Sequence, residues 1–166
     1  MQLPHLGRFV IDKIFKIPEL TNFEIDKLEQ IPLGYLRKNN KTMLGCCRFK
    51  NNSRWIRRNK RGEIIERGKD FWPYENTLGP DDVRKIDIHP DLLADPQWER
   101  LAASVLYHEY LHALGFRHCP TFRALESLWP DKDARLGTRK IKLNSPMYIR
   151  WSVSYTHLRA HETLLY

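Results

Sequence analysis

The feature that most constrains this sequence is a stretch that reads H-E-x-x-H and continues to a glycine and a third histidine. On an α-helix, residues four apart share one face, so His108 and His112 can direct imidazole nitrogens at a single point, with Glu109 beside them. A turn at Gly115 can then bring His118 to the same point. Three nitrogen ligands with a neighbouring carboxylate are typical of zinc hydrolases, in which the metal keeps one position open for water.

The residues before this motif indicate that it lies on a buried helix. Apolar side chains recur there at helical spacing: Trp98, Leu101, Ala102, Val105 and Leu106. Asp95 is a suitable N-cap residue, and Pro96 suits the first helical position. We therefore predict a helix over residues 95–114 that ends at Gly115 and carries a metal site. The alternative is an ordinary helix whose histidines and glutamate form a solvated face.

The length and composition exclude several classes of protein. A chain of 166 residues, 42% of them hydrophobic, can bury one good core, so we expect a single domain. No apolar run approaches the roughly 20 residues that cross a bilayer, and Asp12, Lys13 and Lys16 interrupt the first segment, so no signal peptide is expected. Three cysteines are too few for a disulfide framework. We therefore expect an intracellular, cytoplasmic protein without a membrane partner.

The net charge of +8 is concentrated in residues 34–70, which contain twelve Lys or Arg against three Asp or Glu. A basic segment with interleaved aromatic residues can follow a phosphate backbone and stack on bases, so DNA is a candidate partner. The candidate contacts are Arg48, Lys50, Arg54, Trp55, Arg57, Arg58, Lys60 and Arg61. The alternative is a solvated hairpin whose lysines protect a sheet edge.

Local patterns predict the remaining elements. The N-terminus is expected to be an arm, followed by a short helix that begins with a capping box of Thr21 and Glu24 and ends at Pro32. Strands are predicted over residues 42–50 and 84–89, and a hairpin over 54–58 and 63–67. His89 is expected to end its strand rather than to bind a metal. The other segments are a loop at 68–82, a helix at 120–128 and a final strand within 136–151.

The C-terminal residues are interpreted separately. Residues 153–163 resemble a translated sequencing-adapter sequence, so residues 152–166 are treated as an artefactual tail and excluded from the fold prediction. The histidines of this tail are therefore not candidate ligands.

Over residues 42–131 the sequence resembles the SprT-like metallopeptidases and their small relatives, the YgjP-like proteins and minigluzincins. Four segments carry the resemblance: a Gly-x-Cys-Arg strand at 44–49, a strand and turn at 86–93, the active helix at 105–112 and a His-x-x-x-Phe block at 118–126. The resemblance implies that His108, His112 and His118 bind Zn²⁺ and that Glu109 is the general base.

Together with the local patterns, the resemblance implies an α+β fold. We expect a small zincin-like metallopeptidase domain in which a short, antiparallel-rich sheet packs on the H-E-x-x-H helix. The chain would divide into an N-terminal arm and helix at 1–33, a metallopeptidase domain with a basic hairpin at 34–151, and the tail.

Departures from the SprT-like pattern leave the substrate open. SprT proteins that repair DNA–protein crosslinks usually have a longer spacer before the third histidine and a zinc ribbon or other DNA-binding part after it, and the sequence given contains neither. The spacing from His112 to His118 also fits the metzincin pattern, and residues 145–148 resemble its Met-turn. The block at 118–126 favours the SprT-like family. Glu126 is expected to accept the free N–H of a ligand, with the role of alternative third ligand left open.

The expected function is that of a zinc-dependent endopeptidase acting on a protein or peptide, including DNA-associated proteins. Zinc would polarise the scissile carbonyl and a bound water, while Glu109 accepts the proton of that water and passes it to the leaving amine. The alternative from another class is a nucleic-acid-binding protein with a non-catalytic zinc site. The sequence carries no signal for an oligomeric state.

Overall fold

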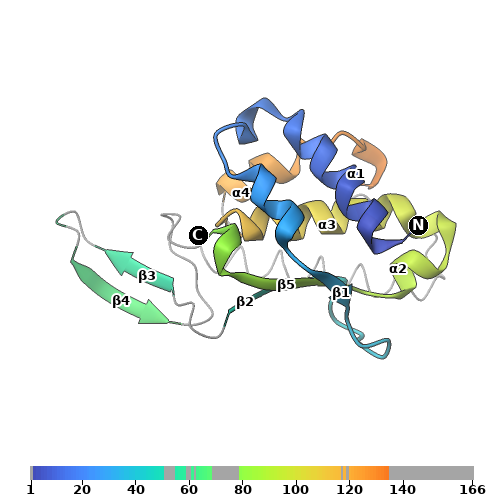
Figure 1. The fold of residues 1–166 in the computed structure, drawn as a ribbon, viewed down its shortest axis with the longest axis horizontal. Helices are drawn as coiled ribbons and strands as arrows, with labels where there is room; N and C mark the ends of the chain where they lie inside the picture. Colours follow the sequence, from blue (N-terminus) through green and yellow to red (C-terminus); the bar gives the residue numbers. More distant parts are fainter. Residues whose placement is uncertain are drawn as a thin grey trace.

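The computed structural model describes residues 2–50, 55–58, 61, 63–68, 79–116, 118 and 120–134. Within them the fold is α+β, as predicted. Two long helices, α1 (Leu3–Phe15) and α3 (Glu99–Ala113), lie on the same face of a three-stranded sheet (Figure 1). The core lies between these helices and the sheet.

The sheet is built around β5 (Val83–Ile88), which lies between β1 (Leu33–Tyr35) and β2 (Gly45–Phe49). Strand β1 pairs with β5 in parallel and β2 pairs with it antiparallel, so the sheet is mixed. Ile86 and Ile88 alternate along β5 and are fully buried, as predicted for a strand beside the metal-site helix. Strand β2 confirms the strand predicted at 42–50.

The predicted hairpin is also present. Strands β3 (Trp55–Arg58) and β4 (Ile64–Gly68) pair antiparallel in a separate two-stranded sheet. Figure 1 shows this sheet to one side of the helices. The final strand predicted within 136–151, the Met-turn-like residues 145–148 and the tail at 152–166 lie outside the described residues.

The helix predicted over 95–114 begins with a short 3-10 turn, η4 (Pro96–Trp98), and continues as α3. The Asp95 carboxylate caps the turn by accepting a hydrogen bond from the Gln97 amide, at 3.1 Å. Every residue of α3 from Leu101 to Ala113 is buried, not only the predicted apolar stripe. The helix is therefore a central element with neighbours on several sides, and any polar side chain in it needs a partner.

The expectation of an N-terminal arm is wrong. Residues 3–15 form the helix α1. Apolar residues recur there at helical spacing and form one buried face, while the charged residues Asp12 and Lys13 lie outside the fully buried stripe. The buried side chains are Leu3, Leu6, Val10, Ile11 and Ile14. They belong to the same hydrophobic cluster as α3, so a boundary at residue 33 does not separate two cores.

The short helix expected after Thr21 also differs from the prediction. It is a 3-10 helix, η2 (Ile25–Gln30), and no side chain caps its first turn. The Thr21 hydroxyl instead donates to the Pro18 carbonyl of the preceding 3-10 turn, η1 (Pro18–Leu20), at 2.8 Å. A local turn therefore competes successfully with the capping box for this hydroxyl.

The remaining described elements are short. They are the 3-10 turn η3 (Pro80–Asp82), α2 (Asp91–Ala94), α4 (Pro120–Glu126) and the 3-10 turn η5 (Lys132–Ala134). Helix α4 confirms the helix predicted at 120–128 but ends two residues earlier. Among the described helices, none is long and apolar enough to cross a membrane.

Replacing Ile14 by alanine should test whether α1 is part of the core. Ile14 is 0% exposed, so we expect the free energy of unfolding to fall by roughly 2–5 kcal/mol, from lost burial and the cavity left behind. The neighbouring Phe15 is 48% exposed, and Phe15→Ala is the matched control, with an expected change within about 0.5 kcal/mol. Urea denaturation measures both. Equal effects would show that α1 does not contribute to the core.

Candidate metal centre

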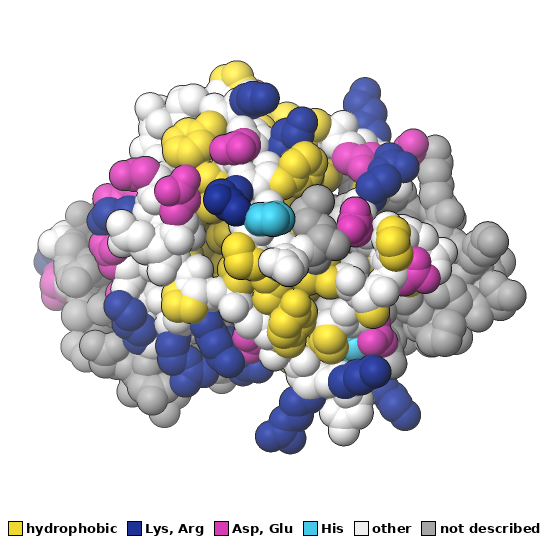
Figure 2. All heavy atoms as spheres, turned by 45° about the vertical axis from the view of Figure 1, so that its right-hand side comes forward, with side chains coloured by type: hydrophobic (Ala, Val, Ile, Leu, Met, Phe, Trp, Pro, Cys, Tyr) yellow, Lys and Arg dark blue, Asp and Glu magenta, His cyan; other side chains and the backbone are white. Residues whose placement is uncertain are grey.

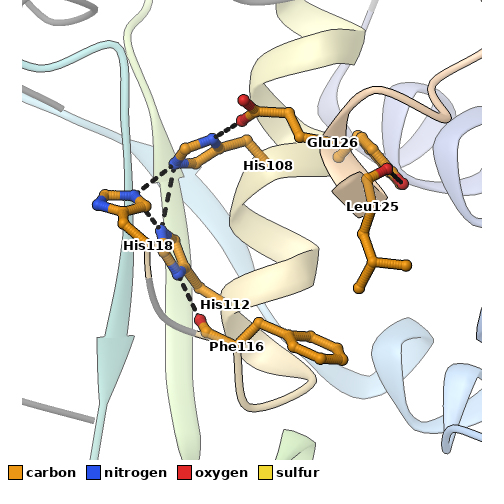
Figure 3. A network of polar contacts seen from close by, with 7 residues as sticks. His108, His112, Phe116, His118, Leu125 and Glu126 are labelled. Atoms are coloured by element: carbon orange, nitrogen blue, oxygen red, sulfur yellow. Dashed lines mark hydrogen bonds and ion pairs between the residues drawn. The ribbon is translucent and has the colours of Figure 1, made fainter. Parts of the chain in front are cut away.

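The Nε2 atoms of three histidines lie close together. The Nε2 atoms of His108 and His112 are 3.2 Å apart, those of His112 and His118 are 3.0 Å apart, and those of His118 and His108 are 3.2 Å apart (Figure 3). His108 and His112 lie one turn apart on α3, and His118 comes from the segment between α3 and α4. These three residues therefore lie close enough together to bind one metal ion.

The hydrogen bonds made by the Nδ1 atoms of His108 and His112 determine whether the Nε2 atoms of these rings donate or accept. Nδ1 of His108 contacts the carboxylate of Glu126, and Nδ1 of His112 contacts the Phe116 carbonyl oxygen at 2.8 Å. Both partners are acceptors, so each Nδ1 carries the hydrogen in the neutral ring and each Nε2 presents a lone pair. The two nitrogen atoms are 3.2 Å apart, so their lone pairs repel each other, and a cation between them would relieve this repulsion.

The size of the nitrogen triangle fits a tetrahedral ion. Zinc–nitrogen bonds of about 2.0–2.1 Å at near-tetrahedral angles place the ligand atoms about 3.3 Å apart. The observed separations of 3.0–3.2 Å are close to this value. The size of the triangle therefore fits an ion with metal–nitrogen bonds of this length.

The turn after α3 is what brings His118 back to the site. Gly115 has φ 107°, a left-handed conformation that favours glycine. Its amide donates to the His112 carbonyl at 2.9 Å, and the Phe116 amide donates to the Leu111 carbonyl at 3.2 Å. These two bonds are those of a Schellman motif, so the predicted glycine stop is confirmed. The same turn positions the Phe116 carbonyl against His112.

Helix α4 places an apolar side chain, that of Phe122, against the three histidine rings. The ring of Phe122, which is fully buried, stacks on His112 at 4.7 Å between centroids and meets His108 and His118 edge-on at 4.8 and 5.1 Å. The helix is fixed to α3 by Tyr107, whose hydroxyl donates to the Leu125 carbonyl. Water is therefore excluded from the side of the three rings that Phe122 covers.

Glu109 lies beside the histidines, and its buried carboxylate has little hydrogen bonding to offset the loss of water. Its side chain is 5% exposed, and its Oε2 atom is buried without a hydrogen-bond partner. Burial raises the pKa of this carboxyl to about 7, against a smaller lowering effect of His108. Burial, and then the neighbouring His118 and His108, lower the pKa of His112 well below its usual value. Its ring is therefore held in the neutral form that binds metals.

Comparison with protein-family models, with curated proteins and with solved structures found no match for this chain. The assignment of the site thus depends on its geometry and chemistry.

The structure does not bring the candidate nucleic-acid contacts to the metal centre. The Arg48 guanidinium donates to the buried carboxylate of Asp87 at 2.7 Å, while Lys50 and Arg61 are exposed. Trp55, Arg57 and Arg58 lie on β3, and Arg54 and Lys60 lie outside the described residues. The candidate contacts that the structure describes therefore lie on or next to β2 and β3, and not on the elements that carry the three histidines.

His89 and the tyrosines of α3 have structural contacts. The His89 ring contacts the Asn40 carbonyl and accepts a hydrogen bond from the Asp91 amide, at 3.0 and 3.1 Å. Tyr107 is engaged with α4, and the Tyr110 hydroxyl lies near Gly7 of α1. Sequence reasoning missed the Phe116 carbonyl, the shared contact of Phe122 and the approach of Gly45 to Glu109. Of these three features, only the contact of Phe122 had a signal in the sequence, the His-x-x-x-Phe block at 118–126.

The metal-free protein should show a pH-dependent effect of Glu109→Gln. The folded-state pKa is raised from 4.5 to about 7, so wild type loses stability as the pH rises through this range. The full shift corresponds to about 3 kcal/mol. Glutamine cannot ionise, so the variant should gain stability over wild type between pH 5 and pH 8, as measured by urea denaturation with a chelator. Glu19→Gln, at an exposed position, is the control. The same pH dependence in wild type and Glu109→Gln would contradict the raised pKa.

Proposed function

We propose that this chain is a zinc-dependent metalloendopeptidase of the SprT-like type. The observation that carries the proposal is the convergence of three Nε2 atoms next to a buried carboxylate whose Oε2 atom has no hydrogen-bond partner. A purely structural metal site would have no use for that carboxylate, whose burial is unfavourable. A hydrolytic site needs a base there.

His108, His112 and His118 would hold the metal. When bound, zinc supplies Lewis acidity and lowers the pKa of water to about 7. Glu109 would accept the proton of the attacking water and return it to the leaving amine. Glu126 and the Phe116 carbonyl would orient two of the imidazoles through their Nδ1 atoms.

Zinc is favoured by the donor set. Three imidazole nitrogens with room for one further ligand are typical of catalytic zinc sites, whereas magnesium and calcium prefer oxygen ligands. The short spacer before the third histidine fits the metzincin pattern and departs from the longer spacer usual in SprT enzymes that repair DNA–protein crosslinks. The contacts of Phe122 and Glu126 with the histidines support the SprT-like alternative, because both residues belong to the block at 118–126.

A peptide substrate is supported by the position of β2. In the sheet formed by the described strands, β2 is an edge strand with β5 as its single neighbour, and an edge strand is where an extended peptide would add to a sheet. Gly45, at the start of β2, lies against Glu109. A peptide paired with this edge would run beside the base.

Glu109→Gln is expected to retain zinc and lose proteolysis. The variant keeps the three histidines but removes the base, whose contribution to such reactions is about 10²–10⁴-fold. We therefore expect cleavage of casein to fall by at least about 10²-fold, with zinc content measured by mass spectrometry unchanged. Glu19→Gln is the matched control, because this glutamate is exposed on η1. Cleavage by Glu109→Gln at the wild-type rate would disprove the role of Glu109.

The basic segment supports a second candidate function, binding of nucleic acid, which could coexist with proteolysis. Its hairpin is formed, and four basic side chains of the described part of the segment between residues 34 and 50 are exposed: Arg37, Lys38, Lys41 and Lys50. Figure 2 shows Lys and Arg side chains gathered along the lower edge of one face of the molecule. Such a surface can bind a phosphate backbone without reading its sequence.

Salt dependence tests this second function. Affinity for single-stranded DNA should fall as ionic strength rises, and replacing Lys50 or Arg61 by glutamine should reduce the slope of log affinity against log salt by about 1 each. Lys16→Gln is the control, because Lys16 is exposed after α1. Fluorescence anisotropy measures the slopes. Affinity that does not change with salt would exclude phosphate binding by this segment.

A further inference from the structure

We propose that Gly45 is a positioning residue for Glu109. Strand β2 would hold the carboxylate in place because it presents backbone, and no side chain, at the point of contact. This role rests on the proposed peptidase function, in which Glu109 is the base.

The contact is too close for any other residue. A Cβ atom at position 45 would lie 2.8 Å from Cγ1 of Val105, 3.1 Å from Cγ of Glu109 and 3.4 Å from its Cδ. Val105 and Glu109 are one turn apart on α3 and face β2 together. Val105 is buried and β-branched, so it cannot move away easily. Gly45 does not have a positive φ, which among the described glycines occurs at Gly115. Packing, and not backbone conformation, therefore requires glycine at position 45.

The contact is significant because hydrogen bonding does little to fix Glu109. Its Oε2 atom is buried without a hydrogen-bond partner, so the position of the side chain depends on the surfaces that enclose it. Gly45 forms one of these surfaces at the Cγ and Cδ atoms, directly behind the carboxylate. A side chain at 45 would displace the carboxylate by a few tenths of an ångström, while His108 and His112, whose Nδ1 atoms are held by Glu126 and Phe116, would stay in place.

The first experiment is Gly45→Ala in the zinc-loaded protein. We expect kcat for a fluorogenic peptide to fall about tenfold or more, since small misplacements of catalytic groups are costly, while KM and zinc affinity stay within about twofold. Gly34→Ala is a control with an equal steric conflict, because its Cβ would lie 2.8 Å from Oδ1 of Asp87, away from the site. Gly79→Ala is a control in open space. An equal fall in kcat for Gly34→Ala would overturn the proposal.

A double variant separates positioning from general packing. Gly45→Ala combined with Val105→Ala removes the tightest conflict, at Val105, and leaves the contact with Glu109. We expect the double variant to be more stable than Gly45→Ala alone and to keep the low kcat. Full recovery of kcat would show that Gly45 acts through helix packing, and would overturn the proposal.

A measurement without substrate tests the contact itself. In metal-free protein, Gly45→Ala should lower the denaturation midpoint in the wild-type background and lower it by a smaller amount in a Glu109→Ala background, where the Cγ and Cδ atoms are absent. Equal shifts would overturn the contact between Gly45 and Glu109. Absence of cleavage by the wild type would instead overturn the peptidase function, so the two failures are distinguishable.

Discussion

The repulsion between Nε2 lone pairs is the interaction on which the site depends. The Nδ1 atoms of His108 and His112 are committed to the acceptors Glu126 and Phe116, which leaves both Nε2 atoms as acceptors at 3.2 Å. Moving the hydrogen of either of these two rings to its Nε2 atom would relieve this conflict, but that ring would lose its Nδ1 hydrogen bond. The fold thus holds two histidines in the arrangement that a cation stabilises, and the Gly115 turn adds His118 as a third ligand.

Burial of α3 on all sides makes that cation important to the electrostatics of the core. Among the described residues, Glu109 and Glu126 are carboxylates near the histidines, and Glu109 is almost fully enclosed. Without a cation, burial favours the protonated form of Glu109 and raises its pKa to about 7. A divalent ion at the nitrogen triangle would act in the opposite direction and favour the carboxylate. The ion and the base therefore stabilise each other.

The sequence could reveal the features that depend on short-range patterns. The helix of His108 and His112, the turn at Gly115 and the central strand with Ile86 and Ile88 were predictable because periodicity and turn residues determine them locally. Helix α1 was missed although its buried residues recur at helical spacing, with the charged Asp12 and Lys13 outside the fully buried stripe. The approach of Gly45 to Glu109 could not be predicted, because it joins residues far apart in the chain whose distance is set by tertiary packing.

The structure assigns the support of the metal ligands and of the base to different elements. Helix α4 contacts the histidines, through the ring of Phe122 and the carboxylate of Glu126, whereas β2 contacts Glu109 through Gly45. His108, Glu109 and His112 lie within about one turn of α3, so a movement of that helix would affect all three together. Changes confined to α4 should alter metal affinity with little effect on the position of Glu109, and changes confined to β2 should do the reverse. The proposed metal ligands and the proposed base could therefore vary separately even though His108 and Glu109 are adjacent in the chain.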